Sequence, residues 1–403
     1  MLDLLKLAAV LIFIIVLMRF KWNLGLVLVL ASALTGLLFG RAPGDLALDA
    51  FGAAVDTLTL RLMAIVLLIT FLGEILRSTL QLEGLIRSLG DLFVDRRWLL
   101  ALLPMLIGLL PMVGGAMFSA PMVEETSQGL DLSRERKTFV NYWFRHVWEC
   151  VFPLYPSLVL AAGLLGVSPQ TLTLTQWPLF LAALAGGVLF GLVGVRRADD
   201  PGDGRPGRKD TLTLLLKSIW PIILVLILAI VLDVDLILSL VVIVAVLVVV
   251  HRLGPRRLWD LVRRMAWGTA PVIVGAMVFR RVLETSHAVE AVSSALTSLG
   301  VPLPVVVFSV PLLAGLLTGL AVAAFAIGFP IVLPLCGPDL IGSGYGLLAY
   351  AGGFVGLLLS PMHFCLALTR VYFKAEWGGI YRRIVPAALV VVIAAAVVVL
   401  ARH

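Results

Sequence analysis

Charged residues are scarce in this sequence. Only 14% of its 403 residues are Asp, Glu, Lys or Arg, whereas 61% are apolar and the mean hydropathy is +1.08. A soluble domain has about a quarter charged residues and close to half apolar ones. The core of a soluble protein could not hide this much apolar surface from water. The composition therefore excludes a soluble protein and predicts that lipid surrounds most of the chain.

Cysteine is also rare, and the motifs of common soluble enzymes are missing. Cys150, Cys336 and Cys365 lie in apolar runs without metal-ligand spacing, and their odd number argues against a disulfide framework. The sequence has no G-x-x-x-x-G-K-[ST], H-E-x-x-H or G-x-S-x-G motif. We therefore expect no catalytic residue and no metal site, and neither an enzyme nor a nucleotide-driven pump. The only expected cofactor is a coupling ion, Na⁺ or H⁺.

Long polar stretches are absent except at residues 196–211, which are rich in charge, glycine and proline. A helix needs about 20 apolar residues to cross a bilayer core about 30 Å thick. The apolar runs that approach or exceed this length lie at residues 2–20, 22–40, 58–77, 97–126, 139–167, 176–195, 213–232, 234–251, 266–285, 302–336, 344–370 and 383–401. The first run has no small-residue cleavage site and is followed at once by a second, so we expect it to be a span.

The net charge of +7 has a topological explanation. Lys and Arg gather in short loops between apolar runs, and such loops face the cytoplasm in membrane proteins. We therefore expect no nucleic-acid partner. The pattern predicts a multi-pass protein of a prokaryotic plasma (inner) membrane, with residues 196–211 as a cytoplasmic linker and both termini outside.

The two halves of the chain resemble each other. The segment PMLIG at 104–108 is matched by PLLAG at 311–315, and both proline and glycine recur after 207 positions. Glu83 and Glu290 are separated by the same number of positions, and Pro121 and Pro330 by 209. The proline-containing break near residue 153 matches a second break near residue 361. The sequence thus predicts an internal duplication.

The basic loops are consistent only if two long runs enter and leave on the same side. Residues 97–126 and 302–336 are long enough for re-entrant helical hairpins. We therefore predict an all-α polytopic membrane protein with two inverted repeats, residues 1–195 and 212–403, joined by the linker at 196–211. Each repeat would contain five transmembrane helices, one of them broken by proline, at about 139–167 and 344–370, and one hairpin.

Interrupted helices at membrane depth are tolerated only where protein or a cavity surrounds them, and paired interruptions in inverted halves indicate a transporter site. This sequence has four, two in the hairpins and two in the broken helices. Merely kinked spans with glycine for close packing are the alternative. The predicted residues for binding a substrate or ion are Gly114, Gly115, Ser119, Pro153, Tyr155, Pro156, Ser157, Thr318, Gly319, Ser360, Pro361 and His363.

Ionisable residues beside these breaks are candidates for ion coupling, because such residues are costly inside a membrane. His146 and Glu149 are three positions apart, so they share a helix face just before the first break. A structural pair, in which Arg145 or His146 neutralises Glu149, remains the alternative. His363 lies in the second break. Arg280, Arg281 and Glu284 are expected to be interfacial anchors or to form salt bridges.

With these features on one chain, the sequence resembles the ion transporter superfamily. That group contains dicarboxylate, citrate, gluconate and arsenite permeases and sodium/proton antiporters. The stretches LLPMVGGAMFSAPMV and NYWFRHVWECVFPLYPSLVLAAGLLG are similar to a prokaryotic membrane family designated domain of unknown function 401. The resemblance covers essentially the whole chain and implies a carrier of the elevator type, with a homodimer as its expected assembly. The Ser-Asn-Thr tips of sodium-coupled dicarboxylate members are missing.

Together these features lead us to expect a secondary active transporter of a small organic anion or related metabolite, coupled to protons or sodium. A sodium/proton or other cation/proton antiporter is the alternative. An intramembrane enzyme acting on lipid-linked substrates would need a polar catalytic cluster. Only Glu149, His146 and His363 could supply one. The expected partners are the bilayer and a small molecule.

Overall fold

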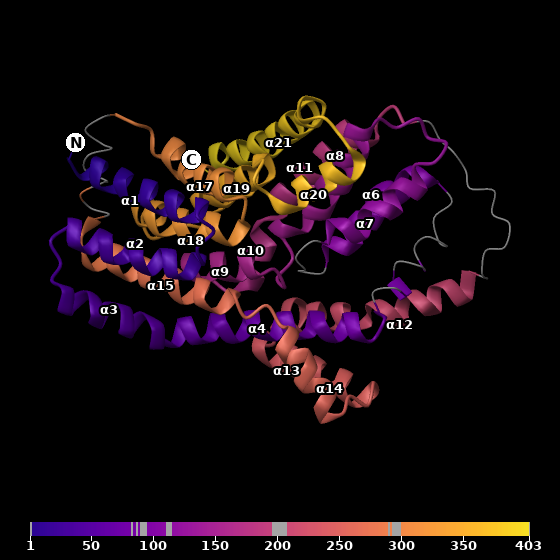
Figure 1. The fold of residues 1–403 in the computed structure, drawn as a ribbon, viewed down its shortest axis with the longest axis horizontal. Helices are drawn as coiled ribbons and strands as arrows, with labels where there is room; N and C mark the ends of the chain where they lie inside the picture. Colours follow the sequence, from indigo (N-terminus) through magenta and orange to yellow (C-terminus); the bar gives the residue numbers. More distant parts are fainter. Residues whose placement is uncertain are drawn as a thin grey trace.

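A computed structural model describes residues 2–81, 84, 85, 88, 95–109, 115–195, 208–288, 291 and 300–402. This part of the chain is helical and has no β-strand, so the predicted all-α class is confirmed. Figure 1 shows the helices packed into one elongated body. The candidate residues Gly114, Glu83 and Glu290 and most of the predicted linker lie outside the described residues.

The helices before the linker are α1 (Leu2–Arg19), α2 (Leu24–Leu38), α3 (Pro43–Val55), α4 (Thr57–Ser78), α6 (Arg96–Gly108), α7 (Ala116–Thr126), α8 (Arg134–His146), η1 (Val147–Cys150), α9 (Pro156–Leu165), α10 (Pro169–Thr175), α11 (Trp177–Gly187) and η2 (Val188–Leu192). Those after it are α12 (Arg208–Leu226), η3 (Ile227–Val231), α13 (Leu236–Val250), α14 (Pro255–Arg264), α15 (Thr269–Thr285), α17 (Leu303–Thr318), α18 (Ala321–Val332), η4 (Leu333–Cys336), α19 (Tyr345–Leu359), α20 (Phe364–Phe373) and α21 (Trp377–Leu400).

Polar residues set the starts of several apolar helices. The side chain of Asn23 accepts from the backbone N–H of Gly25 at 2.9 Å before α2. Asp56 caps α4 and Asp235 caps α13 in the same way. Such caps satisfy N–H groups that have no partner within the helix.

Four described helices are long and apolar enough to cross a membrane, or six if two bent helix pairs each count as one span. The surface of α21 shows why these helices are compatible with a lipid environment. Val385, Leu389, Ile393 and Val397 recur every four residues, form one stripe and are all exposed. Ile384, Ala388, Val391 and Ala395 on the same helix are buried. A helix that is apolar on both faces is typical of a membrane protein.

The two predicted hairpin segments each contain two helices packed against each other. In the first, Arg96 at the start of α6 donates to the carbonyl of Gln128, just after α7, at 3.0 Å. The beginning and end of this segment therefore lie together. In the second, Gly328 of α18 packs on the backbone of Pro311 in α17. Because both residues lie at a similar distance from the turn at Gly319, α17 and α18 run antiparallel.

The two proline-containing breaks separate short helices. In the first, η1 and an extended turn separate α8 from α9. In the second, residues 360–363 separate α19 from α20. Helices α9 and α20 are each ten residues long, and both end at a residue in the left-handed conformation, Gly166 and Lys374. Each half therefore contains a break followed by a ten-residue helix, although only the first break contains a further helical turn, η1.

Helices from the two halves touch backbone to backbone. In α2, Gly25 faces the carbonyl of Pro271 at the start of α15, and a Cβ at Gly275 would lie 2.5 Å from the carbonyl oxygen of Gly25. No side chain larger than hydrogen fits at these positions. Helices α2 and α15 lie side by side in Figure 1, although about 230 positions separate them in the chain.

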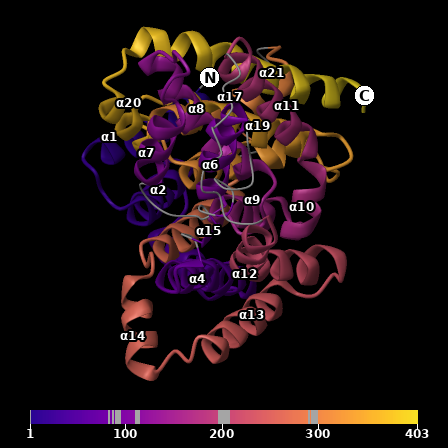
Figure 2. The ribbon, with the colours of Figure 1, turned by 90° about the vertical axis from the view of Figure 1, so that its right-hand side faces the viewer.

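Besides α10, which lies between two of the apolar runs, two helices were not predicted. Residues 43–55 form α3, where the sequence indicated a loop, and its Asp49 accepts from Arg41 at 3.0 Å and from Thr285 at 2.8 Å. Residues 255–264 form α14, which projects from the body with α13 in both ribbon views (Figures 1 and 2). Both helices are amphipathic and short, so a search for long apolar runs passes over them.

Candidate functional site

The first part of the site is the end of α8. Tyr142, Arg145 and His146 are three and four positions apart, so they share one face of this helix. Ser133 begins the helix by accepting from the backbone N–H of Arg136 at 3.2 Å. The helix ends at His146, and the tighter turn of η1 then places Glu149 beside it. All four side chains are buried.

The second part of the site is the break between α19 and α20. The hydroxyl of Ser360 donates to the carbonyl of Leu316 in α17 at 2.6 Å and accepts from the N–H of Met362 at 3.2 Å. These bonds hold the break against the second hairpin. His363 follows as the residue that begins α20 and is 8% exposed.

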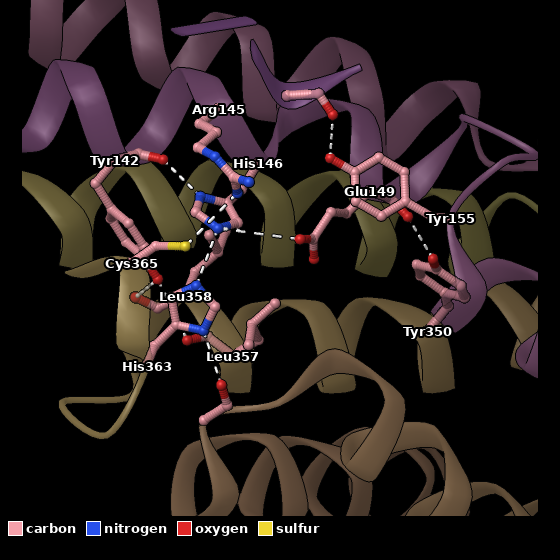
Figure 3. A network of polar contacts seen from close by, with 12 residues as sticks. Tyr142, Arg145, His146, Glu149, Tyr155, Tyr350, Leu357, Leu358, His363 and Cys365 are labelled. Atoms are coloured by element: carbon pink, nitrogen blue, oxygen red, sulfur yellow. Dashed lines mark hydrogen bonds and ion pairs between the residues drawn. The ribbon is translucent and has the colours of Figure 1, made fainter. Parts of the chain in front are cut away.

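The two breaks meet through a pair of histidines. His146 Nε2 lies 2.9 Å from His363 Nε2, although 217 positions separate the residues. His146 Nδ1 lies 2.6 Å from the carbonyl oxygen of Tyr142, and His363 Nδ1 lies 2.7 Å from that of Gly319. Figure 3 shows the two rings joined at their tips, with a carbonyl oxygen behind each.

Glu149 lies next to this pair and is only loosely bound to it. Its Oε1 is 4.0 Å from His146 Nε2, which is too long for a hydrogen bond. Its Oε2 is buried and has no hydrogen-bond partner among the described residues. Tyr350 donates to the main-chain carbonyl of Glu149 and fixes the backbone there. The carboxylate is therefore positioned by its backbone and not by a strong ion pair with His146.

Arg145 lies on the other side of His146 and is 4% exposed. Its Nη1 is 3.6 Å from the Sγ of Cys365 on α20. Its guanidinium also lies directly on Gly115, where a Cβ would collide with it. Gly115, just before α7 in the first hairpin segment, is therefore in contact with the cation at the first break.

A cavity of about 350 Å³ opens beside these side chains. The two breaks provide its polar wall, and the apolar tip of the second hairpin, residues 319–322, also lines it. Leu24 of α2, Thr70 of α4 and Val272 of α15 close the far side. Most of the remaining lining is apolar. The cavity is thus large enough for a small molecule and presents few polar groups to it.

The structure brings some predicted residues together and leaves others apart. Tyr155, Pro156, Ser157, Gly319, His363, His146 and Glu149 line the cavity. Thr318 instead donates to the carbonyl of Ala314 at 2.6 Å, and Ser119 to that of Ala116 at 3.3 Å, so each hydroxyl binds within its own helix. Pro153, Ser360, Pro361 and Gly115 do not line the cavity, although Ser360 and Gly115 contact it through His363 and Arg145.

Several cavity residues were not predicted. Arg145 was considered only as a partner of Glu149, and Cys365 only as a small apolar residue. Leu24, Thr70 and Val272 have no signal in the sequence, because they are ordinary residues of helices that pack here. Arg145 directly precedes His146 in the sequence, so a search for a cation next to His146 and Glu149 would have found it.

The site also holds three residues of metal-ligand type. One ligand atom each of His146, His363 and Cys365 lies within 4.8 Å of the others. In a tetrahedral Zn²⁺ site with Zn–N distances of about 2.0–2.1 Å, two ligand nitrogens lie about 3.3 Å apart. The 2.9 Å between the Nε2 atoms is instead a hydrogen-bond distance, and the Arg145 guanidinium adjoins the sulfur. The arrangement fits a hydrogen bond better than a metal centre.

Residues 2–402 match the model of the family described as "Protein of unknown function (DUF401)". The chain belongs to the DUF401 family. No curated protein matches it. The predicted resemblance to this family is therefore confirmed.

Proposed function

We propose that this DUF401 protein is a secondary transporter that binds a small organic anion with an apolar body in the 350 Å³ cavity. The observation that carries the proposal is the meeting of two helix breaks, one from each half of the chain, at a cavity wall. Unbroken helices would suffice for a structural role. Broken helices at a cavity provide free backbone groups for a solute.

The charges around the cavity favour an anion. Among the described lining residues, Arg145 is the one Lys or Arg and Glu149 is the one carboxylate. Glu149 lies 4.0 Å from the His146 ring, so Arg145 and the helix ends provide the positive charge for a solute. Helices α9 and α20 both begin at the cavity wall, where Ser157 and Phe364 lie, so the N–H groups of their first turns are directed toward it. Helix N-termini carry partial positive charge and bind anions. The apolar remainder of the wall suits a hydrocarbon body.

We further infer that the two halves are inverted repeats and that the carrier is of the elevator type. Matched contacts support the repeat. Gly108 of α6 packs on the backbone of Arg145 at the end of α8, and Gly315 of α17 packs on that of Gly353 in α19. The two glycines are 207 positions apart. In both halves, the first helix of the hairpin therefore lies against the helix that precedes the break.

A ligand screen on the purified protein tests the proposal. Aliphatic and aromatic monocarboxylates are compared with their uncharged amides for thermal stabilisation in detergent. A ligand at one hundred times its Kd stabilises the folded state by about 2.7 kcal/mol. We expect carboxylates to stabilise and amides not to, and Arg145→Gln to lose the effect. Arg61→Gln, which removes an exposed ion pair with Asp235, serves as the control.

The best ligand is then tested in proteoliposomes by counterflow with a radiolabelled copy. Accumulation that depends on an unlabelled internal pool is expected. Equal stabilisation by amides and carboxylates would contradict the anion site. Binding without counterflow would contradict transport.

The cation/proton antiporter remains the second candidate because of one observation. The Oε2 atom of Glu149 is buried and without a hydrogen-bond partner among the described residues, as an ion ligand could be. A pH-sensitive dye inside proteoliposomes separates the two functions. Proton movement on adding Na⁺ or K⁺ alone, lost in Glu149→Gln, would favour the antiporter.

A further inference from the structure

The hydrogen atoms of the histidine pair can be counted from its neighbours. A carbonyl oxygen only accepts hydrogen bonds, so a ring nitrogen facing it must carry hydrogen. His146 Nδ1 faces the carbonyl of Tyr142, and His363 Nδ1 faces that of Gly319. These contacts assign a hydrogen to both Nδ1 atoms. In a neutral imidazole the other nitrogen, Nε2, then has a bare lone pair.

Two neutral rings would consequently place two lone pairs against each other. The Nε2 atoms are 2.9 Å apart, and both rings are buried, with exposed fractions of 1% and 8%. Such a contact is repulsive unless one nitrogen carries hydrogen. A single proton converts it into an N–H···N hydrogen bond of ordinary length. The pair then carries three hydrogens on four nitrogens and one positive charge.

We propose that His146 and His363 jointly bind one proton between their Nε2 atoms, and that this proton is the coupling ion of the transporter. The second part rests on the proposed function, whereas the first does not. Glu149, 4.0 Å from His146 Nε2, provides the opposite charge. The other charged or titratable groups around the pair are Tyr142, Arg145, Tyr155, Tyr350 and Cys365.

The proton also joins two separate segments of the proposed carrier. His146 belongs to the first break, whereas His363 is bound to Gly319 at the tip of the second hairpin. When the proton leaves for the cavity, the lone pairs face each other and the rings must separate. Because His363 is tied to the tip, the tip loses its contact with α8. Proton release would therefore open the cavity at the second hairpin.

Nuclear magnetic resonance of ¹⁵N-histidine-labelled protein in micelles tests the bound proton. The chain has five histidines, so few signals are expected. We expect one exchange-protected N–H proton coupled to two ring nitrogens. It should be lost in His146→Gln and in His363→Gln, and kept in His251→Gln, whose ring contacts Gln81. The wild-type spectrum alone is decisive if a variant fails to fold.

Hydrogen exchange of the peptide around Gly319 tests the opening. After correction for the intrinsic exchange rate, protection in the wild type should fall as the pH rises, and the two His→Gln variants should lose this pH dependence. Two unprotonated Nε2 atoms, or stoichiometric zinc on them, would overturn the shared proton. A shared proton without any anion counterflow would support the proton site and contradict the proposed transport function. Anion counterflow that does not depend on pH would contradict only the claim that this proton is the coupling ion.

Discussion

Replacing Gly319 with alanine should weaken the protein more than replacing Gly166, although both glycines end a helix with positive φ. Gly319 has φ of +68° and Gly166 has φ of +71°. At Gly319 an added Cβ would lie 2.7 Å from the backbone N of His363 and 2.7 Å from the carbonyl carbon of Met362. At Gly166 it would meet nothing within 4 Å. A comparison of the two variants therefore separates the cost of backbone strain from the cost of the steric collision.

The expected magnitudes follow from these contacts. Placing alanine in the left-handed region costs about 1–2 kcal/mol, and this cost applies to both variants. Forcing a methyl group into a packed site costs about 1–3 kcal/mol more, because backbone atoms cannot rotate out of the way. We expect Gly166→Ala to lower the free energy of unfolding by about 1–2 kcal/mol and Gly319→Ala by about 2–5 kcal/mol.

The free energy of unfolding can be measured by titrating SDS into mixed micelles and following tryptophan fluorescence. The same two variants can be examined for the shared histidine proton. The collision should push His363 away from His146, so Gly319→Ala should also lose this signal while Gly166→Ala keeps it. Equal destabilisation of the two variants, with the proton signal intact in both, would refute the described contact between hairpin tip and second break.

Three further predictions concern the free energy of unfolding. Gly25→Ala should lower the free energy of unfolding by about 1–3 kcal/mol, because its Cβ would collide with the backbone of Pro271. Gly73→Ala, with open space around it in α4, should be neutral or stabilising by up to about 1 kcal/mol in the same titration. Tyr350→Phe should cost about 1–3 kcal/mol, because the buried carbonyl of Glu149 loses its donor. No loss of stability in Tyr350→Phe would count against that bond.

Much of the fold follows from patterns that act locally. Apolar content and run length predict the all-α class, because lipid leaves the backbone little choice but helix. Proline predicts the two breaks, because it acts on the chain within one turn, but Pro121 and Pro330 lie inside α7 and α18. The breaks near Pro156 and His363 could therefore be located from the sequence alone.

The contacts between these breaks could not be predicted. That His146 and His363 meet depends on how α8 and α20 pack, and nothing near either residue encodes it. The same holds for Arg145, whose position against Cys365 is set by tertiary structure. Thr318 was predicted to bind a substrate or ion, but its hydroxyl donates to a carbonyl of its own helix.

The contact of Gly25 with Gly275 has a mechanical consequence. Two helices that touch backbone to backbone cannot slide along each other, because the next residues would bring side chains into the gap. Helices α2 and α15 must therefore move as one piece, although they come from opposite halves of the chain. Whatever moves in this protein, a shear between the two halves of the chain cannot separate α2 from α15.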